Sequence, residues 1–172
     1  MQHSSTSADS ADTNRGGFAQ LSVPAPIVAT LNRLGITEPF PIQQLTLPDS
    51  LAGRDVLGRG ATGSGKTLSF SIPTVARVAA QQGHSAPNRP RALILVPTRE
   101  LAAQVAEVVE PIATAMSLRC TTVFGGVSQV PQVAALRKGV DILIACPGRL
   151  EDLIAQRLCS LADVRVTVLD EA

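Results

Sequence analysis

The stretch Gly60-Ala61-Thr62-Gly63-Ser64-Gly65-Lys66-Thr67 decides the fold of this 172-residue chain. It matches the pattern G-x-x-x-x-G-K-[ST], a phosphate-binding loop, at every defined position. Its three glycines permit backbone conformations closed to other residues, so that successive N–H groups converge on one anion. Lys66 can then reach the β- and γ-phosphates of a nucleotide, and the Thr67 hydroxyl can ligate Mg²⁺. The alternative interpretation is an ordinary glycine-rich turn.

The residues on either side of the loop favour phosphate binding. Arg54 to Leu57 reads as a short strand before the loop, and the segment Leu68 to Ile72 reads as an apolar helix after it. A helix that begins near Lys66 directs the positive end of its dipole toward the same phosphates. Strand, loop and helix in this order form the context in which the motif binds nucleotides.

The composition is that of a single globular domain. Hydrophobic residues make up 45% of the chain and charged residues 17%, which allows a substantial core. The net charge of +1 provides no general basic field, so any nucleic-acid contact must come from locally placed groups. Lys66 and Lys138 are the only lysines beside thirteen arginines, so Lys66 is less expected as a casual surface residue.

The cysteines and the hydropathy pattern indicate an intracellular protein. Cys120, Cys146 and Cys159 have neither paired nor metal-type spacing, so we expect reduced, mostly buried thiols and a cytoplasmic location. No apolar run approaches the roughly eighteen residues of a membrane helix, and no apolar signal segment begins the chain. We therefore expect a soluble protein that makes no membrane contact. The oligomeric state does not follow from these features; we expect a monomer.

Apolar runs alternate with helical patterns along the chain. They predict five buried strands, at residues 54–57, 92–96, 119–124, 140–145 and 164–169. This alternation requires right-handed crossovers, and therefore predicts an α/β fold with a parallel sheet covered by helices on both faces. We expect the sheet to be incomplete at the C-terminal end, where a further strand and helix would follow, and to expose apolar surface there.

Local signals predict where several helices begin and end. Ser22 is expected to cap a helix with Pro24 in its first turn, and Gly35 is expected to end it. Thr98 is the expected N-cap of a later helix, which Pro111 should kink. The expected core face of the first helix consists of Ile27, Leu31 and Leu34.

Several informative segments directly follow predicted strands. Ligands of parallel sheets bind at the carboxyl ends of the strands, so these segments should share one edge. Upstream of the loop, Gln43 offers the donors and the acceptor that an adenine edge requires, although a surface or capping role is the alternative. The segments after the strands are the glycine loop, Pro97-Thr98-Arg99, Gly125-Gly126, Cys146-Pro147-Gly148-Arg149 and Asp170-Glu171.

With these residues in place, the chain resembles the N-terminal RecA-like domain of DEAD-box ATP-dependent RNA helicases. The order and spacing of six motifs, from about Phe18 to the last residue, are more specific than any one of them. Gly35 to Gln43 is similar to the Q motif, with Phe18 near its isolated upstream aromatic, and the glycine loop is similar to motif I. The later matches are Pro97-Thr98-Arg99-Glu100-Leu101 to motif Ia, Gly125-Gly126 to the double glycine, Cys146-Pro147-Gly148-Arg149 to T-P-G-R, and Asp170-Glu171-Ala172 to the first letters of D-E-A-D.

The resemblance divides the chain into three segments. Residues 1–16 are expected to form a disordered polar tail, residues 17–45 the Q-motif region, and residues 46–172 the ATP-binding RecA-like domain. The family's S-A-T segment and second RecA-like domain, with its arginine finger, have no counterpart in these residues. The chain therefore reads as the front half of a helicase, with little or no activity of its own. The loop 83–91 reads as a plain surface connection.

Three residues depart from the family pattern. Gly60 stands where the family usually has alanine, which should loosen the loop. Phe40 replaces a small hydroxyl residue of the Q motif, so one capping hydrogen bond should be missing. Cys146 replaces a threonine whose hydroxyl would contact an RNA phosphate, and a thiol is a poor donor, so weaker contact is expected there.

The resemblance implies an ATP site with Mg²⁺. Phe18 would stack or pack against adenine, and Gln43 would bond its edge; for Phe18 the alternative is packing onto the first helix. Asp170 would reach the metal through water, together with Thr67, because an unpaired carboxylate at the end of a buried strand is costly. Glu171 would position and deprotonate the attacking water, unless the acidic pair merely begins a turn. The triphosphate would be held by Thr62, Gly63, Ser64, Gly65, Lys66 and Thr67, with Lys66 also catalytic.

The resemblance also implies RNA contacts that carry no sequence information. Backbone N–H groups and guanidinium groups would contact phosphates, and 2′-hydroxyls would distinguish RNA from DNA. An ion pair at a helix start is the alternative for Arg99 and Glu100, and ordinary turns are the alternative for the rest. The implied RNA-binding residues are Pro97, Thr98, Arg99, Gly125, Gly126, Pro147, Gly148 and Arg149.

Two functional hypotheses remain open at this point. The first is the ATP-binding half of an RNA-stimulated ATPase and helicase. The second is a non-catalytic module that binds nucleotide or RNA. A phosphate-loop ATPase that acts on DNA or in transport lacks support, because no L-S-G-G-Q precedes the acidic pair.

Overall fold

The computed structural model describes residues 17–61, 63–81 and 83–171, so the predicted tail 1–16 lies outside the described residues. Helices and strands alternate from β1 onward, as the sequence predicts. In chain order, the elements are η1 (Gly17–Leu21), α1 (Ala25–Arg33), α2 (Pro41–Leu51), α3 (Lys66–Ala79), β1 (Ala92–Leu95), α4 (Arg99–Ala115), β2 (Cys120–Val123), α5 (Val130–Arg137), β3 (Ile142–Ala145), α6 (Pro147–Ala155) and β4 (Val166–Leu169).

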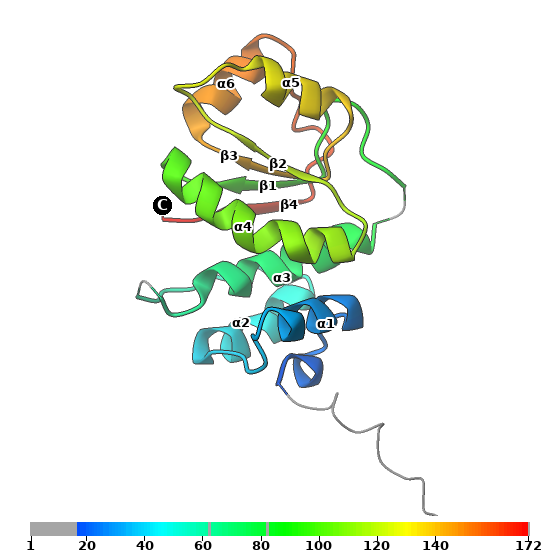
Figure 1. Cartoon of the computed structure of the whole chain (residues 1–172), viewed down its shortest axis with the longest axis vertical. Helices are drawn as coiled ribbons and strands as arrows, with labels where there is room; N and C mark the ends of the chain where they lie inside the picture. The colour runs from blue at the N-terminus through cyan, green and yellow to red at the C-terminus, as the bar shows by residue number, and fades with distance from the viewer. Residues whose placement is uncertain (1–16, 62, 82, 172) are drawn as a thin grey trace, which may run out of the picture.

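The four described strands form one parallel sheet in the order β2-β3-β1-β4. Leu93 of β1 is in register with Leu143 of β3 and with Thr167 of β4. Figure 1 shows α3 and α4 on one face of the sheet and α5 and α6 on the other, with α1 and α2 outside α3. The predicted α/β fold with helices on both faces is confirmed.

The sheet separates two apolar cores. Successive side chains of β1 point to opposite faces, so Ala92 and Ile94 join the core beneath α1, α3 and α4, while Leu93 joins the core beneath α5 and α6. Burial on both faces explains why β1 and β3 read as continuous apolar runs in the sequence. Packing on both faces thus holds the sheet in place beneath the loops at its carboxyl edge.

The prediction of a strand at residues 54–57 is wrong, and four of the five predicted strands are present in the described residues. The segment 54–58 lies across a cavity of about 410 Å³ from β4, whose described partner is β1 alone. A strand needs a neighbour for its backbone groups, and this segment has none in the described residues. Leu57 is consequently 90% exposed, against the expectation of a buried strand.

Three helix predictions have different outcomes. Thr98 caps α4 as predicted, accepting a hydrogen bond from the Leu101 N–H at 3.2 Å. Ser22 does not cap α1: its φ is 63°, and the residue at the N-cap is Pro24, which has no acceptor side chain. Leu34, predicted for the core face, is exposed, because it lies at the C-cap where α1 ends before Gly35.

The prediction that residues 83–91 form a plain surface connection is also wrong. Ser85 and Arg91 are buried and both bind Asp141, the residue before β3. Oδ1 of Asp141 accepts hydrogen bonds from the Ser85 hydroxyl at 2.6 Å and from Nη2 of Arg91 at 2.7 Å. These residues tie the connection to the amino ends of β1 and β3, at the edge of the sheet away from the glycine loop.

Three further expectations concern membrane helices, the division at residue 45 and Pro111. Among the described residues, no helix is both long and apolar enough to cross a membrane. The helix α2 runs across the division predicted between residues 45 and 46, so the Q-motif region and the following domain share one helix. Pro111 lies inside α4, which continues past it to Ala115.

Candidate functional site

The glycine loop leads directly into α3, which begins at Lys66 as predicted. Gly65 occupies the N-cap with φ 86° and ψ 16°, a left-handed conformation that favours glycine. A Cβ at this position would lie 2.5 Å from both Nε2 of Gln43 and Cδ2 of Phe40. Conformation and space therefore both require glycine, and the loop is held tightly against the start of α2.

Gln43 is the residue that fastens the loop to α2. Its side chain is 1% exposed, its Oε1 accepts from the Phe40 N–H at 2.9 Å, and its Nε2 donates to the Gly65 carbonyl at 2.9 Å. The bond to Phe40 is the capping role left open by the sequence, and it supports the helix start where the Phe40 side chain offers no acceptor. Both polar ends of the Gln43 amide thus form hydrogen bonds within the protein.

The two aromatic residues near the site differ in exposure. Phe18 is 1% exposed and packs in the core beneath α1, α3 and α4, so the structure favours packing, the alternative considered above, over an open ring for adenine. Phe40 is 52% exposed and lies against Gly65. In the sequence, Phe40 reads only as the loss of a hydroxyl, although the same residue also places an aromatic ring beside the loop.

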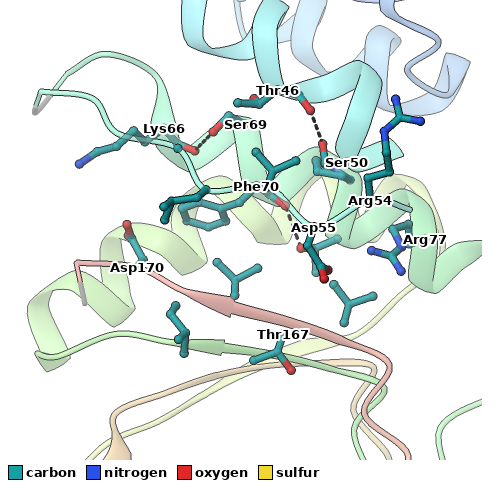
Figure 2. Close-up of a pocket in the computed structure, with 18 of the residues that line it drawn as sticks. Thr46, Ser50, Arg54, Asp55, Lys66, Ser69, Phe70, Arg77, Thr167 and Asp170 are labelled. Carbon is teal, nitrogen blue, oxygen red and sulfur yellow. Dashed lines mark hydrogen bonds between the residues drawn. The ribbon is translucent and has the colours of Figure 1, made fainter. Parts of the chain in front are cut away.

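The acidic pair after β4 meets the glycine loop. Nζ of Lys66 lies 2.9 Å from Oε1 of Glu171, 105 residues further along the chain. Figure 2 shows Lys66 at the start of α3 and Asp170 at the end of β4, on two walls of the same cavity. Burial, together with the neighbouring Glu171 carboxylate, raises the pKa of Asp170, while Lys66 opposes this shift.

The donor set in this region fits a phosphate group. Ser64 Oγ is buried in the loop and has no hydrogen-bond partner within the described part of the chain. A Cβ on Gly60 would lie 2.6 Å from that oxygen, so the glycine leaves room for the Ser64 hydroxyl. The structure does not describe Thr62.

The Thr67 hydroxyl and the Asp170 carboxylate suit a magnesium ion that keeps part of its water shell, and not a metal whose ligands all come from the protein. Thr67 lies half-buried in the first turn of α3, and Asp170 is half-buried at the end of β4. No cluster of three or more His, Cys, Asp or Glu suited to a metal occurs among the described residues. Mg²⁺ retains several waters and takes oxygens from phosphates, so a hydroxyl and a carboxylate are a sufficient protein contribution.

Arg99 pairs with Glu100 and also lies close to Gly126. Its Nε lies 2.6 Å from Oε1 of Glu100, the helix-start pair considered as the alternative. The hydrogen bond with Glu100 raises the pKa of Arg99, and the same bond lowers the pKa of Glu100. Nη1 of Arg99 lies 3.7 Å from where a Cβ on Gly126 would be, which joins the segments after β1 and β2.

The remaining segments lie at the starts of α5 and α6. Nη2 of Arg149 donates to the Val127 carbonyl at 3.0 Å, next to Gly126. Pro147 and Gly148 are exposed in the first turn of α6. Cys146, half-buried at the N-cap of α6, makes no side-chain capping bond, and burial raises the pKa of its thiol.

Gln132 is a buried residue of this region that no pattern in the sequence indicates. Its Nε2 donates to the Phe124 carbonyl at 3.0 Å, and its Oε1 accepts from Nη1 of Arg149 at 3.5 Å. A glutamine in an amphipathic helix carries no distinctive pattern. Only its position on α5, directly behind the two segments, reveals it.

Comparisons with known proteins identify the family of the chain. Residues 40–172 match the family model described as DEAD/DEAH box helicase. The chain is 40% identical over 168 residues to "DEAD-box ATP-dependent RNA helicase 5" of Oryza sativa subsp. japonica, covering 96% of this chain and 32% of that protein. It is 42% identical over 158 residues to "ATP-dependent RNA helicase RhlB" of Sodalis glossinidius, covering 90% of this chain and 38% of that protein.

A solved structure is similar as well. The RNA helicase Prp28 from Chaetomium thermophilum, bound to ADP, superposes with a TM-score of 0.82 at 34% identity, covering 90% of this chain and 38% of that one. The chain thus spans about a third to two fifths of the length of the two curated relatives named above. Because the family model matches more than half of its residues, the chain belongs to the DEAD/DEAH box helicase family.

Proposed function

We propose that this chain is the ATP-binding half of an ATP-dependent RNA helicase, whose full-length form couples RNA-stimulated ATP hydrolysis to local unwinding of duplexes. The observation that carries the proposal is the contact between Lys66 and Glu171, 105 residues apart. It joins the phosphate-binding loop to an acidic pair at one edge of a parallel sheet. Relatives that are named ATP-dependent RNA helicases support the same reading.

In the proposed ATP site, backbone N–H groups of the loop hold the phosphates and Lys66 neutralises charge on the β and γ oxygens. Lys66 is paired with Glu171 in this structure, so nucleotide binding exchanges a carboxylate partner for phosphate. That exchange releases Glu171 to orient and deprotonate water. Thr67 and Asp170 would hold Mg²⁺, which supplies charge neutralisation at the phosphates.

The proposed RNA surface comprises the segments after β1, β2 and β3. A Cβ at Gly125 or Gly148 would meet nothing within 4 Å, so internal packing does not demand glycine at either position. Small residues at an exposed edge allow the backbone of a nucleic acid to approach closely. Pro97 and Thr98 are exposed beside Arg99, at the start of α4. We assign phosphate contacts to this edge.

The test compares Lys66→Ala with Lys138→Ala, since Lys138 is the other lysine and is exposed at the end of α5. Titration with a fluorescent ADP analogue should show about a tenfold or greater loss of affinity for Lys66→Ala, and no loss for Lys138→Ala. Equal affinity in both variants would exclude the loop as the nucleotide site.

Catalysis is tested in the full-length protein with Glu171→Gln. This variant should bind nucleotide while its RNA-stimulated hydrolysis falls by about 10²- to 10⁴-fold, the usual contribution of a general base. Stimulation by single-stranded DNA as strong as by RNA would contradict the RNA assignment.

The second candidate is a non-catalytic module that binds nucleotide or RNA. The chain spans 32% of its rice relative and 38% of its Sodalis relative, so hydrolysis by these 172 residues alone is a separate question from hydrolysis by a full-length protein. Robust RNA-stimulated hydrolysis by the 172 residues alone would exclude this candidate. We further propose a reducing compartment such as the cytoplasm, in keeping with three free cysteines. We also propose that the protein is a monomer.

A further inference from the structure

A buried amide lies between the two segments of the proposed RNA surface that follow β2 and β3. Gln132 is 8% exposed, although it belongs to a helix whose neighbouring residues 130 and 131 are exposed. Its Nε2 bonds the carbonyl of Phe124, the residue after β2. Its Oε1 faces Nη1 of Arg149, in the first turn of α6.

The guanidinium of Arg149 bonds both Gln132 and the far end of the turn after β2. Nη2 donates to the Val127 carbonyl at 3.0 Å, while Nη1 reaches Gln132 at 3.5 Å. The turn Gly125-Gly126 lies between Phe124 and Val127, the two carbonyls that Gln132 and Arg149 bind. Both ends of that turn are therefore fixed from one side.

We propose that Gln132 is a positioning residue for RNA binding, which orients Arg149 and the Gly125-Gly126 turn as a single surface. This inference rests on the proposed function. Gln132 itself is buried and would not touch RNA; it acts through Arg149 and through the Phe124 carbonyl.

The cost of burying an unpaired amide favours a single, ordered orientation of the Gln132 side chain. Burying an amide without partners costs about 1–3 kcal/mol, so the side chain is held in the one orientation that satisfies both of its ends. Gly126 has φ 79° and no side chain to restrict it, so its turn depends on external contacts for order. An ordered turn offers its N–H groups to a phosphate without an entropic cost at binding.

The experiment compares Gln132→Leu with Gln129→Ala. Gln129 is a suitable control because its side chain, at the N-cap of α5, also bonds Gln156 at the C-cap of α6, at 3.1 Å, and this hydrogen bond is exposed. Fluorescence anisotropy with a single-stranded RNA oligonucleotide should show about a five- to tenfold weaker affinity for Gln132→Leu, and an unchanged affinity for Gln129→Ala. Affinity for an ADP analogue should stay the same in both variants.

A double-mutant cycle separates positioning from general destabilisation. If Gln132 acts through Arg149, the variant Gln132→Leu/Arg149→Ala should bind RNA no more weakly than the worse single variant. Losses that multiply, or RNA binding by Gln132→Leu equal to that of the native chain, would overturn the inference. If Gln132→Leu does not fold, Gln132→Glu replaces it, because that variant keeps an acceptor for Arg149 but cannot donate to Phe124.

Amide hydrogen exchange gives a readout that needs no RNA. Residues 124–128 should exchange faster in Gln132→Leu than in the native chain, and at the native rate in Gln129→Ala. Unchanged exchange in Gln132→Leu would overturn the inference. A native chain that binds no RNA, but whose turn loosens in Gln132→Leu, would instead defeat the RNA part of the proposed function.

Discussion

Nε2 of Gln43 donates a hydrogen bond to the carbonyl oxygen of Gly65 at 2.9 Å, linking α2 to the last residue of the glycine loop before α3. The other end of the same amide holds the Phe40 N–H at the start of α2. A single buried side chain thus sets the position of the loop relative to the helix that precedes it. Three of the predictions below concern this junction.

Replacing Gln43 should loosen the loop. Gln43→Ala leaves the Gly65 carbonyl and the Phe40 N–H without this partner, and losing a buried hydrogen bond costs about 1–3 kcal/mol of unfolding free energy. We expect that loss in denaturant unfolding, together with weaker binding of an ADP analogue. Gln44→Ala is the control, because Gln44 is an exposed neighbour that bonds Pro39. Equal stability of the two variants would contradict the assigned role.

Two glycines of the loop separate conformational strain from steric conflict. Gly63 and Gly65 both have positive φ, of 80° and 86°, but a Cβ meets nothing within 4 Å at Gly63 and lies 2.5 Å from Gln43 at Gly65. Gly63→Ala should lower the unfolding free energy by about 1–2 kcal/mol from strain alone. Gly65→Ala should lower it further and displace Gln43. Thermal unfolding of both variants measures the difference. Equal losses of unfolding free energy would show that Gln43 and Phe40 move aside at no cost.

Phe18 and Phe40 should affect different properties. Phe18→Ala removes a fully buried ring and should lower the unfolding free energy by about 3–5 kcal/mol. Phe40→Ala should change stability little, because the ring is half-exposed, but weaken binding of an adenine nucleotide several-fold if the ring contacts the base. Calorimetric titration with ADP and with a pyrimidine nucleoside diphosphate tests the base contact. A stable Phe40→Ala variant with native ADP affinity would assign the ring no part in binding.

The buried ion pair between Arg91 and Asp141 should make stability depend on pH. Burial acts to raise the pKa of Asp141, but hydrogen bonds from the Arg119 N–H, Ser85 and Arg91 outweigh it and lower the pKa overall. The stabilisation is therefore complete above the pKa of the unfolded carboxyl, about 4, and is lost as pH falls through the lower folded value.

Asp141→Asn tests this pH dependence. The variant should lose about 3–5 kcal/mol at neutral pH, because Arg91 remains buried without its charged partner, and its stability should change less between pH 5 and 2. Asp163→Asn is the matched control, since Asp163 pairs with Arg89 at 2.8 Å at a more exposed position. Denaturant unfolding across this pH range provides the measurement. Parallel pH profiles for Asp141→Asn and the native chain would refute the assignment.

The sequence by itself determined the features that depend on a few neighbouring residues. The loop pattern predicted the start of α3 at Lys66, Thr98 predicted the cap of α4, and the apolar runs at residues 92–96 and 140–145 predicted buried parallel strands. Backbone conformation, capping and side-chain periodicity act over short distances along the chain, so their pattern is visible in the sequence. The rule that ligands bind at the carboxyl ends of parallel strands also predicted one shared edge for the glycine loop and the acidic pair, where Lys66 and Glu171 meet.

Only the tertiary structure decided which groups find partners. Residues 54–57 read as a short strand in the sequence, but they lie across a cavity from β4 and do not form one. Phe18 is buried while Phe40 is exposed beside the loop, and Gln132 bonds Arg149, 17 residues away. Burial and hydrogen bonding depend on segments brought together from distant parts of the chain, and no local pattern records which segment will be adjacent.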